Sequence, residues 1–160
     1  MKFSVESRPS SPGAGDILVL PYLDEKPLAH PAVAAVLKKL GSTPLKLLKK
    51  EAFKGDAGDS RTFATHGNLP FDYVLFMGLG AAKKLNLESL RKASAKSVQA
   101  ADRLKAKKMV SLLPLAIGKT ADVAEAGQAY AEGAVLGLYR FEKYKSKKEK
   151  DGNLREVRYV

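Results

Sequence analysis

Histidine is the side chain best suited to acid–base or metal chemistry near neutral pH, and this chain has two, His30 and His66. Neither has a second histidine at the H-x-x-x-H spacing of a helical zinc site, and no cluster of carboxylates surrounds them. The chain has no cysteine, which excludes thiolate metal sites and disulfides. Hydrolysis by two metals needs carboxylates that converge on ions about 3.5–4 Å apart, whereas the acidic residues here are mostly solitary. The sequence therefore predicts no catalytic residue, no metal ligand and no cofactor-binding residue.

A glycine turn is the second candidate for chemistry. Gly78-Leu79-Gly80 follows an apolar run from Tyr73 to Met77, as the phosphate-binding turn of a dinucleotide fold does. The third small position of that motif falls on Lys83, however, and the next helical pattern begins only near Asn86. A phosphate-binding helix should begin at the turn, so that its amides point at the anion. Two interpretations remain: a nucleotide-type ligand site, or a tight turn that lets a strand and a helix pack.

Positive charge is the third candidate, because 28 lysines and arginines against 17 acidic residues give a net charge of +11. An excess of that size attracts polyanions. One set of side chains shares a helix face at steps of three to four residues, and a second set clusters around Tyr144. The side chains that could contact nucleic-acid phosphates are Lys92, Lys96, Arg103, Lys107, Lys143, Lys145, Lys147 and Lys148, with Gln99 and Lys150 beside them. The alternative is a solvated surface that keeps a small domain soluble.

The elements that must position these residues are organised around the run from Tyr73 to Met77. Five apolar residues without a polar break predict a strand that is buried on both faces and ended by Gly78 and Gly80. A helix should then run from about Asn86, a good N-cap, to Lys105. Further strands are predicted at Lys2–Glu6, Ile17–Leu20 (closed by Pro21), Ser60–Thr65, Met109–Leu113 (ended by Pro114) and Glu156–Val160. Further helices are predicted from His30-Pro31 to a stop at Gly41, at Pro44–Glu51 and at about Thr120–Tyr139.

The helix predicted at Thr120–Tyr139 contains three glycines, Gly127, Gly133 and Gly137. Each of them costs about 1 kcal/mol of helix propensity relative to alanine. Three such positions in one helix indicate that another backbone approaches closely, and a frayed helix is the alternative.

These alternating elements predict a single α/β domain over residues 1–160, with three layers in which helices flank a mixed sheet of about five or six strands. The strand at Ser60–Thr65 is close enough to the central strand to pair with it as an antiparallel hairpin. No run of about 18 apolar residues could span a membrane, and the N-terminus lacks the apolar stretch of a signal peptide. Since the chain also has no cysteine, the expected compartment is the cytoplasm.

Four motifs occur together over roughly Ile17 to Val160. They are Phe53-Lys54-Gly55 with Gly58, then Val74-Leu75-Phe76-Met77-Gly78-Leu79-Gly80, then Leu87-Glu88-Ser89-Leu90-Arg91-Lys92-Ala93, and finally Ala131-Glu132-Gly133-Ala134-Val135-Leu136-Gly137-Leu138-Tyr139-Arg140-Phe141 with Tyr144-Lys145-Ser146. In this order and spacing they resemble the N-terminal domain of the leucyl (cytosol) aminopeptidase family. One departure is Asp56, where the family's F-x-G-K pattern has a lysine.

The resemblance implies a non-catalytic N-terminal domain of a dinuclear metallopeptidase, which serves the assembly and positioning of the catalytic domain. Family members release N-terminal amino acids from peptides with two divalent ions, zinc, manganese or magnesium, held in a second, C-terminal domain. The signature of that domain, N-T-D-A-E-G-R, is not in this sequence, so no catalytic residue carries over. The resemblance also implies a macro-like fold, packing at the subunit contacts of a hexamer and, in some bacterial members, a contribution to DNA binding.

Two alternative functions remain open: a basic nucleic-acid-binding module, and a nucleotide-type ligand binder with a macro-like pocket. The expected partners are the C-terminal catalytic domain, further copies of the parent in a homo-oligomer and, for the first alternative, DNA. A detached domain would also expose surface that the parent covers. The candidates for that surface are Tyr130, Leu138, Phe141 and Tyr159, and the alternative is that all four belong to the core.

Overall fold

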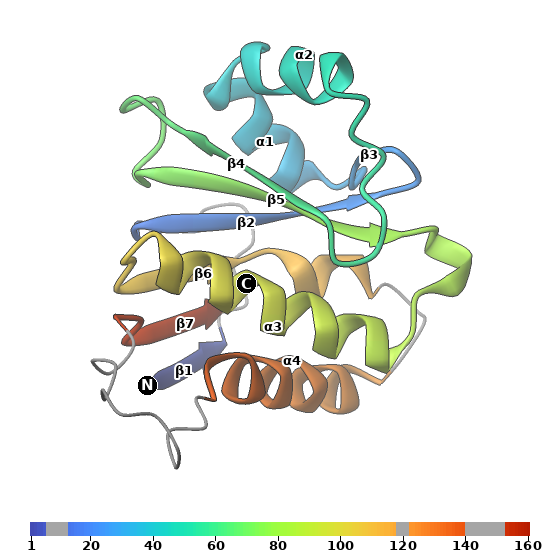
Figure 1. Ribbon diagram of the computed structural model, residues 1–160, viewed down its shortest axis with the longest axis vertical. Helices are drawn as coiled ribbons and strands as arrows, with labels where there is room; N and C mark the ends of the chain where they lie inside the picture. Colours follow the sequence, from blue (N-terminus) through green and yellow to red (C-terminus); the bar gives the residue numbers. More distant parts are fainter. Residues whose placement is uncertain (6–12, 118–121, 140–152) are drawn as a thin grey trace, which may run out of the picture.

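The computed structural model describes residues 1–5, 13–117, 122–139 and 153–160. These ranges form one sheet with helices on both of its faces (Figure 1). The order along the sheet is β1 (Lys2–Val5), β7 (Glu156–Tyr159), β6 (Lys108–Ser111), β2 (Ile17–Leu23), β5 (Tyr73–Gly80) and β4 (Ser60–Ala64), with the short β3 (Lys26–Pro27) beside β2. β3 and β4 are antiparallel to their neighbours, and the other pairs are parallel. The mixed α/β sheet predicted from the sequence is confirmed, with a short β3 that was not expected.

Two pairs of helices cover the sheet, one pair on each face (Figure 1). The helices are α1 (Pro31–Leu40), α2 (Thr43–Lys50), α3 (Leu87–Arg103) and α4 (Val123–Leu138). α1 and α2 enclose one hydrophobic cluster with the sheet, and α3 and α4 enclose the other. None of the helices in the described ranges is long and apolar enough to cross a membrane.

The burial of β5 explains why helices are needed on both faces of the sheet. Along this strand, Val74 and Phe76 belong to the cluster under α1 and α2, whereas Leu75 and Met77 belong to the cluster under α3 and α4. All four side chains have no exposed surface. Alternate residues of a strand point to opposite faces, so an unbroken apolar run requires burial on both sides. The prediction of a doubly buried central strand is confirmed.

β5 includes Gly78 and ends at Gly80, so the expected turn is confirmed for the second glycine and wrong for the first. The strand runs to Gly80, whose φ of +74° lets the chain turn there. The loop at residues 53–59 lies against this end of the strand: Gly58 N donates to Gly78 O (3.0 Å) and Gly78 N donates to Asp59 O (2.7 Å). A Cβ on Gly78 would stand 2.6 Å from the carbonyl carbon of Gly55. Gly78 is therefore a point of close backbone approach inside a strand, not a turn.

β2 continues through Pro21 to Leu23, so the expectation that this proline closes the strand is wrong. The carbonyls of Val19 and Pro21 point to the same side of β2, where they accept hydrogen bonds from the amides of Leu112 (2.9 Å) and Leu28 (3.0 Å). The missing N–H of Pro21 faces that side too, in the interval between the end of β6 and the start of β3. Proline therefore leaves the ladder between β2 and β5 intact.

The remaining elements lie close to their predicted positions. The His30 side chain caps α1 by accepting a hydrogen bond from Ala32 N (3.2 Å), and Gly41 ends the helix with a φ of +86°. Asn86 caps α3 in a reciprocal arrangement with Ser89. β4 and β5 form the predicted antiparallel pair. β6 stops at Ser111 rather than at 113, because a 3₁₀ helix begins at 113. The predicted positions Glu6 and 120–121 lie outside the described residues.

α3 and α4 pack at backbone distance, as the glycines of α4 predict. A Cβ on Gly133 would stand 2.9 Å from the carbonyl carbon of Arg91, and one on Gly137 would stand 2.7 Å from the Cα of Ala95. Both contacts advance by four residues in the same direction, so the two helices run parallel. Gly127 differs, because nothing lies within 4 Å of a Cβ placed there. The prediction of close backbone approach is confirmed for two of the three glycines and wrong for Gly127.

A pair of buried tyrosines joins α4 to β7. The rings of Tyr130 and Tyr159 lie 5.3 Å apart, and the Tyr159 hydroxyl lies 3.0 Å from Ser94 Oγ. Tyr130 donates to the Leu113 carbonyl (2.7 Å). Burial raises the pKa of Tyr159 to about 12 and raises the pKa of Tyr130 further. Of the two alternatives, the structure therefore assigns Tyr130 and Tyr159 to the core and not to an exposed patch; Leu138 is half-buried, and Phe141 lies outside the described residues.

We predict that Gly133→Ala lowers the free energy of unfolding by about 1–3 kcal/mol, because its methyl group forces two backbones apart. Gly127→Ala is the matched control in the same helix. It adds a methyl group in open space and removes a helix-interior glycine, so it should raise stability by up to about 1 kcal/mol. Urea unfolding followed by circular dichroism measures both. Equal effects of the two substitutions would show that α3 and α4 do not pack at this distance.

We also predict that stability falls as the pH rises from about 10 to about 12, because Tyr159 has a pKa of about 12 in the folded chain and about 10 when unfolded. The unfolded chain ionises first, so the loss begins at the lower pH and amounts to about 3 kcal/mol for this group. Tyr159→Phe should flatten the decline, while Tyr139→Phe, at an exposed ring, should not. Urea midpoints at several alkaline pH values measure this, and identical slopes in both variants would contradict it.

Candidate functional site

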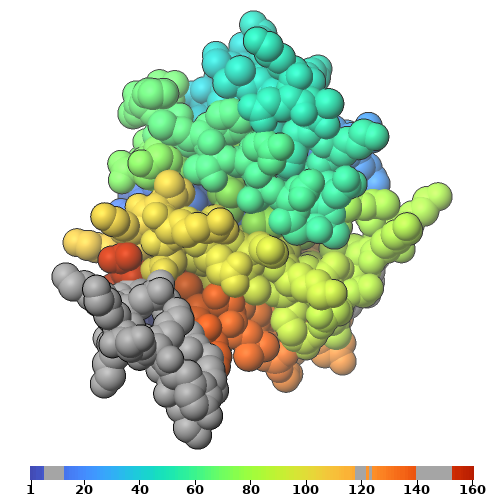
Figure 2. Space-filling view, in the orientation of Figure 1, coloured from blue at the N-terminus to red at the C-terminus, as the bar shows by residue number. Residues whose placement is uncertain are grey.

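The outer face of α3 carries the basic stripe that its sequence predicts. Lys92, Lys96 and Arg103 are exposed on this helix, which forms the surface beside α4 in Figure 2. Lys92 Nζ lies 3.6 Å from Glu88 Oε1, so part of its charge is offset. Gln99 is half-buried and donates to the Gly137 carbonyl (3.1 Å), which binds α3 to α4. The stripe is thus a solvated helix face with exposed cations.

Within the described ranges, the one other member of the predicted basic surface, Lys107, does not belong to this stripe. Lys107 follows the end of α3, and its backbone amide donates to the Asp16 carboxylate. The second group lies outside the described residues: Lys143, Lys145, Lys147, Lys148 and Lys150, with Tyr144. Phosphate binding by these side chains stays a prediction, and a mobility shift at low salt would test it.

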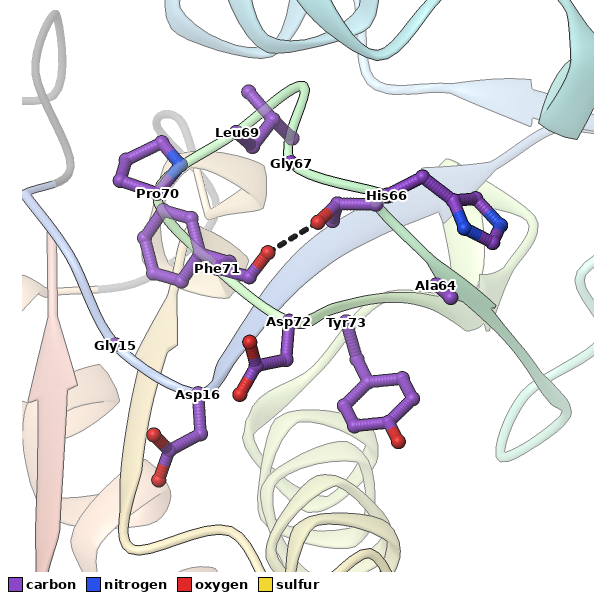
Figure 3. A pocket seen from close by; sticks show the side chains of 11 residues that line it. Gly15, Asp16, Ala64, His66, Gly67, Leu69, Pro70, Phe71, Asp72 and Tyr73 are labelled. Atoms are coloured by element: carbon purple, nitrogen blue, oxygen red, sulfur yellow. Dashed lines mark hydrogen bonds between the residues drawn. The ribbon is translucent and has the colours of Figure 1, made fainter.

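A cavity of about 590 Å³ opens where β2 and β5 begin (Figure 3). The polar groups of Asp16 in its wall are held by internal bonds. The Asp16 carboxylate accepts a hydrogen bond from Lys108 N (3.0 Å), and the Asp16 carbonyl accepts from the amides of Asp72 and Tyr73 (both 3.0 Å). These bonds tie together the starts of β2, β5 and β6. The Asp16 carboxylate is a structural link that sequence reasoning missed, and an aspartate directly before a buried strand was its only signal.

His66 lines the same cavity, but its ring points away from the carboxylates of Asp16 and Asp72 (Figure 3). It occupies a turn with a φ of +52°. His30, the other histidine, uses its ring nitrogen to cap α1. Among the described residues, no group of three or more histidine, aspartate or glutamate side chains could hold a metal ion. The described part of the chain therefore does not fit a dinuclear metal centre.

The Gly78-Leu79-Gly80 segment at the end of β5 has both of its glycine amides paired within the fold. Gly78 N donates to Asp59 O, and Gly80 N donates to Gly55 O (2.9 Å). The same loop brings the Asp56 carbonyl against Gly78, while the Asp56 side chain points to solvent. A phosphate cradle needs unpaired amides that point outward. The geometry favours the interpretation of Gly78-Leu79-Gly80 as a packing feature.

A second cavity, of about 400 Å³, lies between the edge strand β1 and the first half of α4. Its walls are almost wholly apolar, and the two tyrosine hydroxyls nearby are engaged with Leu113, Ser94 and Tyr130. The cavity is lined by Phe3, Val5, Pro114, Ile117, Ala124, Gly127, Tyr130, Ala131 and Tyr159. A site with these walls suits an apolar side chain better than a polar ligand.

At the surface, α3 and α4 are joined by one arginine. Arg91 donates to Glu132 Oε2 on α4 (2.8 Å) and to Glu88 Oε2 on its own helix (2.8 Å). Hydrogen bonds from Gln128 and from Arg91 lower the pKa of Glu132. The pair stays ionised near neutral pH, so α4 presents little uncompensated charge at this point.

Known proteins of this architecture include enzymes and macrodomains. The Mn-bound form of the bottromycin maturation enzyme BotP is 26% identical, with a TM-score of 0.65 over 92% of this chain and 27% of that chain. A tomato leucine aminopeptidase mutant has a TM-score of 0.80 at 18% identity, over 99% of this chain and 32% of its own. The macrodomain of Mycobacterium tuberculosis DarG has a TM-score of 0.72 at 10% identity, over 99% and 97%. The last two likenesses confirm the macro-like fold alone.

Sequence relatives are closer. Probable cytosol aminopeptidases of Alkaliphilus metalliredigens and Aquifex aeolicus are 30% identical over 159 residues and 37% identical over 127 residues. The alignments cover 98% and 79% of this chain but only 32% and 24% of those proteins, so the chain spans about a third of the length of such relatives or less. Residues 19–148 match the family model described as the cytosol aminopeptidase family, N-terminal domain. The chain therefore belongs to the cytosol aminopeptidase family and corresponds to its N-terminal domain.

Proposed function

We propose that this chain is the non-catalytic N-terminal domain of a dinuclear metallo-aminopeptidase, and that it serves the assembly and positioning of the catalytic domain. The observation that carries the proposal is the match of residues 19–148 to the family's N-terminal domain, in a chain that spans 32% of its Alkaliphilus relative. On this proposal residues 1–160 are one domain, and the catalytic domain belongs to the remaining length of the parent protein.

The state of the chain's polar side chains supports a structural role. Asp16 holds the amides at the start of β6, His30 caps α1, and Arg91 bridges α3 and α4. Groups that are fixed in this way stabilise elements and are not aimed together at a reacting atom, as the groups of an active site must be. Cleavage of the peptide bond would then depend on residues of the catalytic domain.

Metal dependence belongs to the proposed parent and not to the described residues. BotP is described in complex with Mn, and a two-ion centre that activates water would supply the hydrolytic chemistry. We assign zinc, manganese or magnesium to the catalytic domain, and release of N-terminal amino acids from peptides to the parent. The relatives carry the name cytosol aminopeptidase, which supports a cytoplasmic location for that parent.

A fusion tests the proposal. We predict that this chain, joined to the C-terminal part of the Aquifex aeolicus relative, forms a defined oligomer and releases leucine from a leucyl peptide in the presence of Mn²⁺. The C-terminal part alone should assemble poorly and lose at least roughly tenfold in activity, because misplacement of reacting groups by about 1 Å already has effects of that size or larger. Light scattering and leucine release measure the two outcomes.

The chain offers matched variants for this fusion. Gly133→Leu, which separates α3 from α4, should reproduce the defect of the missing domain, whereas Lys96→Ala on the outer face of α3 should not. Hydrolysis of the leucyl peptide by the purified chain alone would contradict the proposal. So would a C-terminal part that assembles and works as well without this domain.

A further inference from the structure

α4 leaves large apolar side chains uncovered, beside the exposed Glu125 and Gln128. Residues 120–139 contain no lysine or arginine, in a chain with 28 such residues. On the uncovered side, Val135, Leu136 and Tyr139 have exposed fractions of 53%, 64% and 70%. Large apolar side chains that gather on the uncovered side of a helix are typical of an interaction surface.

α3, the neighbour of α4 in the same layer, shows how a solvated helix differs. Its uncovered side carries Lys92, Lys96 and Arg103. The two helices share one face of the sheet and run parallel, so their contrast does not come from a different depth in the fold. The outer side of α3 exposes cations, whereas the outer side of α4 exposes large apolar side chains of the kind found at interaction surfaces.

Gly127 supports the same conclusion independently. A glycine inside a helix costs about 1 kcal/mol relative to alanine. Contacts with α3 explain Gly133 and Gly137, but nothing in the described structure lies within 4 Å of a Cβ at Gly127. Together with Ala124 and Ala131, one turn before and one turn after, Gly127 lines the apolar cavity beside β1. Small residues on this side of α4 leave room for a group that comes from outside.

The cavity itself is suited to an apolar side chain. Val5 at its rim has an exposed fraction of 80%, and the hydroxyls of Tyr130 and Tyr159 already have partners inside the fold. A cavity with almost wholly apolar walls suits an aromatic or aliphatic anchor of a protein partner better than a polar ligand. The cavity and the exposed end of α4 lie on the same helix.

The length of the relatives identifies the occupant. The matching family model is an N-terminal domain, and the Alkaliphilus relative is about three times as long as the aligned part. A catalytic domain in the same polypeptide is present at one copy per chain and at high effective concentration.

We propose that the outer side of α4, together with the cavity between α4 and β1, is the surface on which the catalytic domain of the parent aminopeptidase docks, with an apolar side chain of that domain in the cavity. This inference rests on the proposed function and deepens it by naming the surface.

Cysteine labelling tests the proposal, because the chain has no cysteine of its own. Val135→Cys places a thiol on the outer side of α4, and Lys96→Cys is the control on α3. Each variant is labelled with a maleimide in the isolated chain and in the fusion with the C-terminal part of the Aquifex aeolicus relative, and mass spectrometry of the peptide reports each rate. Position 135 should react at least roughly tenfold more slowly in the fusion, since docking must open first, and position 96 should react equally in both.

Three results would overturn the docking surface. Equal labelling of position 135 in both proteins would show that the face stays open. Protection in the isolated chain that grows with its concentration would assign the face to a second copy of this chain. Protection of position 135 in the isolated chain at every protein concentration would show that other residues of the same chain cover this face. Leucine release and oligomer size, measured on the same samples, report the proposed function separately: an active fusion with a reactive position 135 rejects only the surface.

A second variant probes the cavity without relying on labelling rates alone. Gly127→Leu extends into the cavity, where the isolated chain has open space, so the melting temperature of the isolated chain should stay the same or rise. In the fusion the same variant should restore rapid labelling at position 135, because the anchor loses its place. A fusion in which position 135 stays protected despite Gly127→Leu would remove the cavity from the proposal.

Discussion

The adjacent strands β2 and β5 are buried on both faces, and most of the architecture follows from that burial. Their side chains alternate between two hydrophobic clusters, so neither face can be left in water. At about 25 cal/mol per Å² of apolar surface, one uncovered face would cost the domain several kcal/mol, comparable with the whole stability of a small domain. α1 and α2 on one side and α3 and α4 on the other meet this requirement, and the close approach of α4 to α3 completes it.

Sequence patterns predicted the elements whose causes are local. The apolar run of β5, the caps at His30 and Asn86 and the stop at Gly41 all depend on residues a few positions apart, and each lies where it was expected. The errors at Gly78 and Pro21 have distant causes. Gly78 remains in its strand because the loop at 53–59 bonds to it, and Pro21 remains in its strand because its missing amide faces the interval between β6 and β3. Nothing within a few residues of either position reveals those partners.

The candidate site was predictable to a similar extent. The helical period of α3 places Lys92, Lys96 and Arg103 on one solvated face, and the combined motifs predicted the family that the comparisons confirm. The use of the Asp16 carboxylate by amides 91 and 92 residues away could not be predicted from a single sequence. Sequence reasoning did not name Val135, Leu136 and Tyr139 as exposed apolar residues, because the contact at Gly133 decides how α4 is rotated against the sheet.

The parallel contact between α3 and α4 has a mechanical consequence. Gly133 and Gly137 hold α4 at backbone distance from Arg91 and Ala95, and a helix seated so closely cannot slide or tilt alone. Leu90 and Val98 of α3 in turn belong to the same cluster as Leu75 of β5. A force on the outside of α4 should therefore displace α4, α3 and the central strands together, because no loosely packed layer separates them.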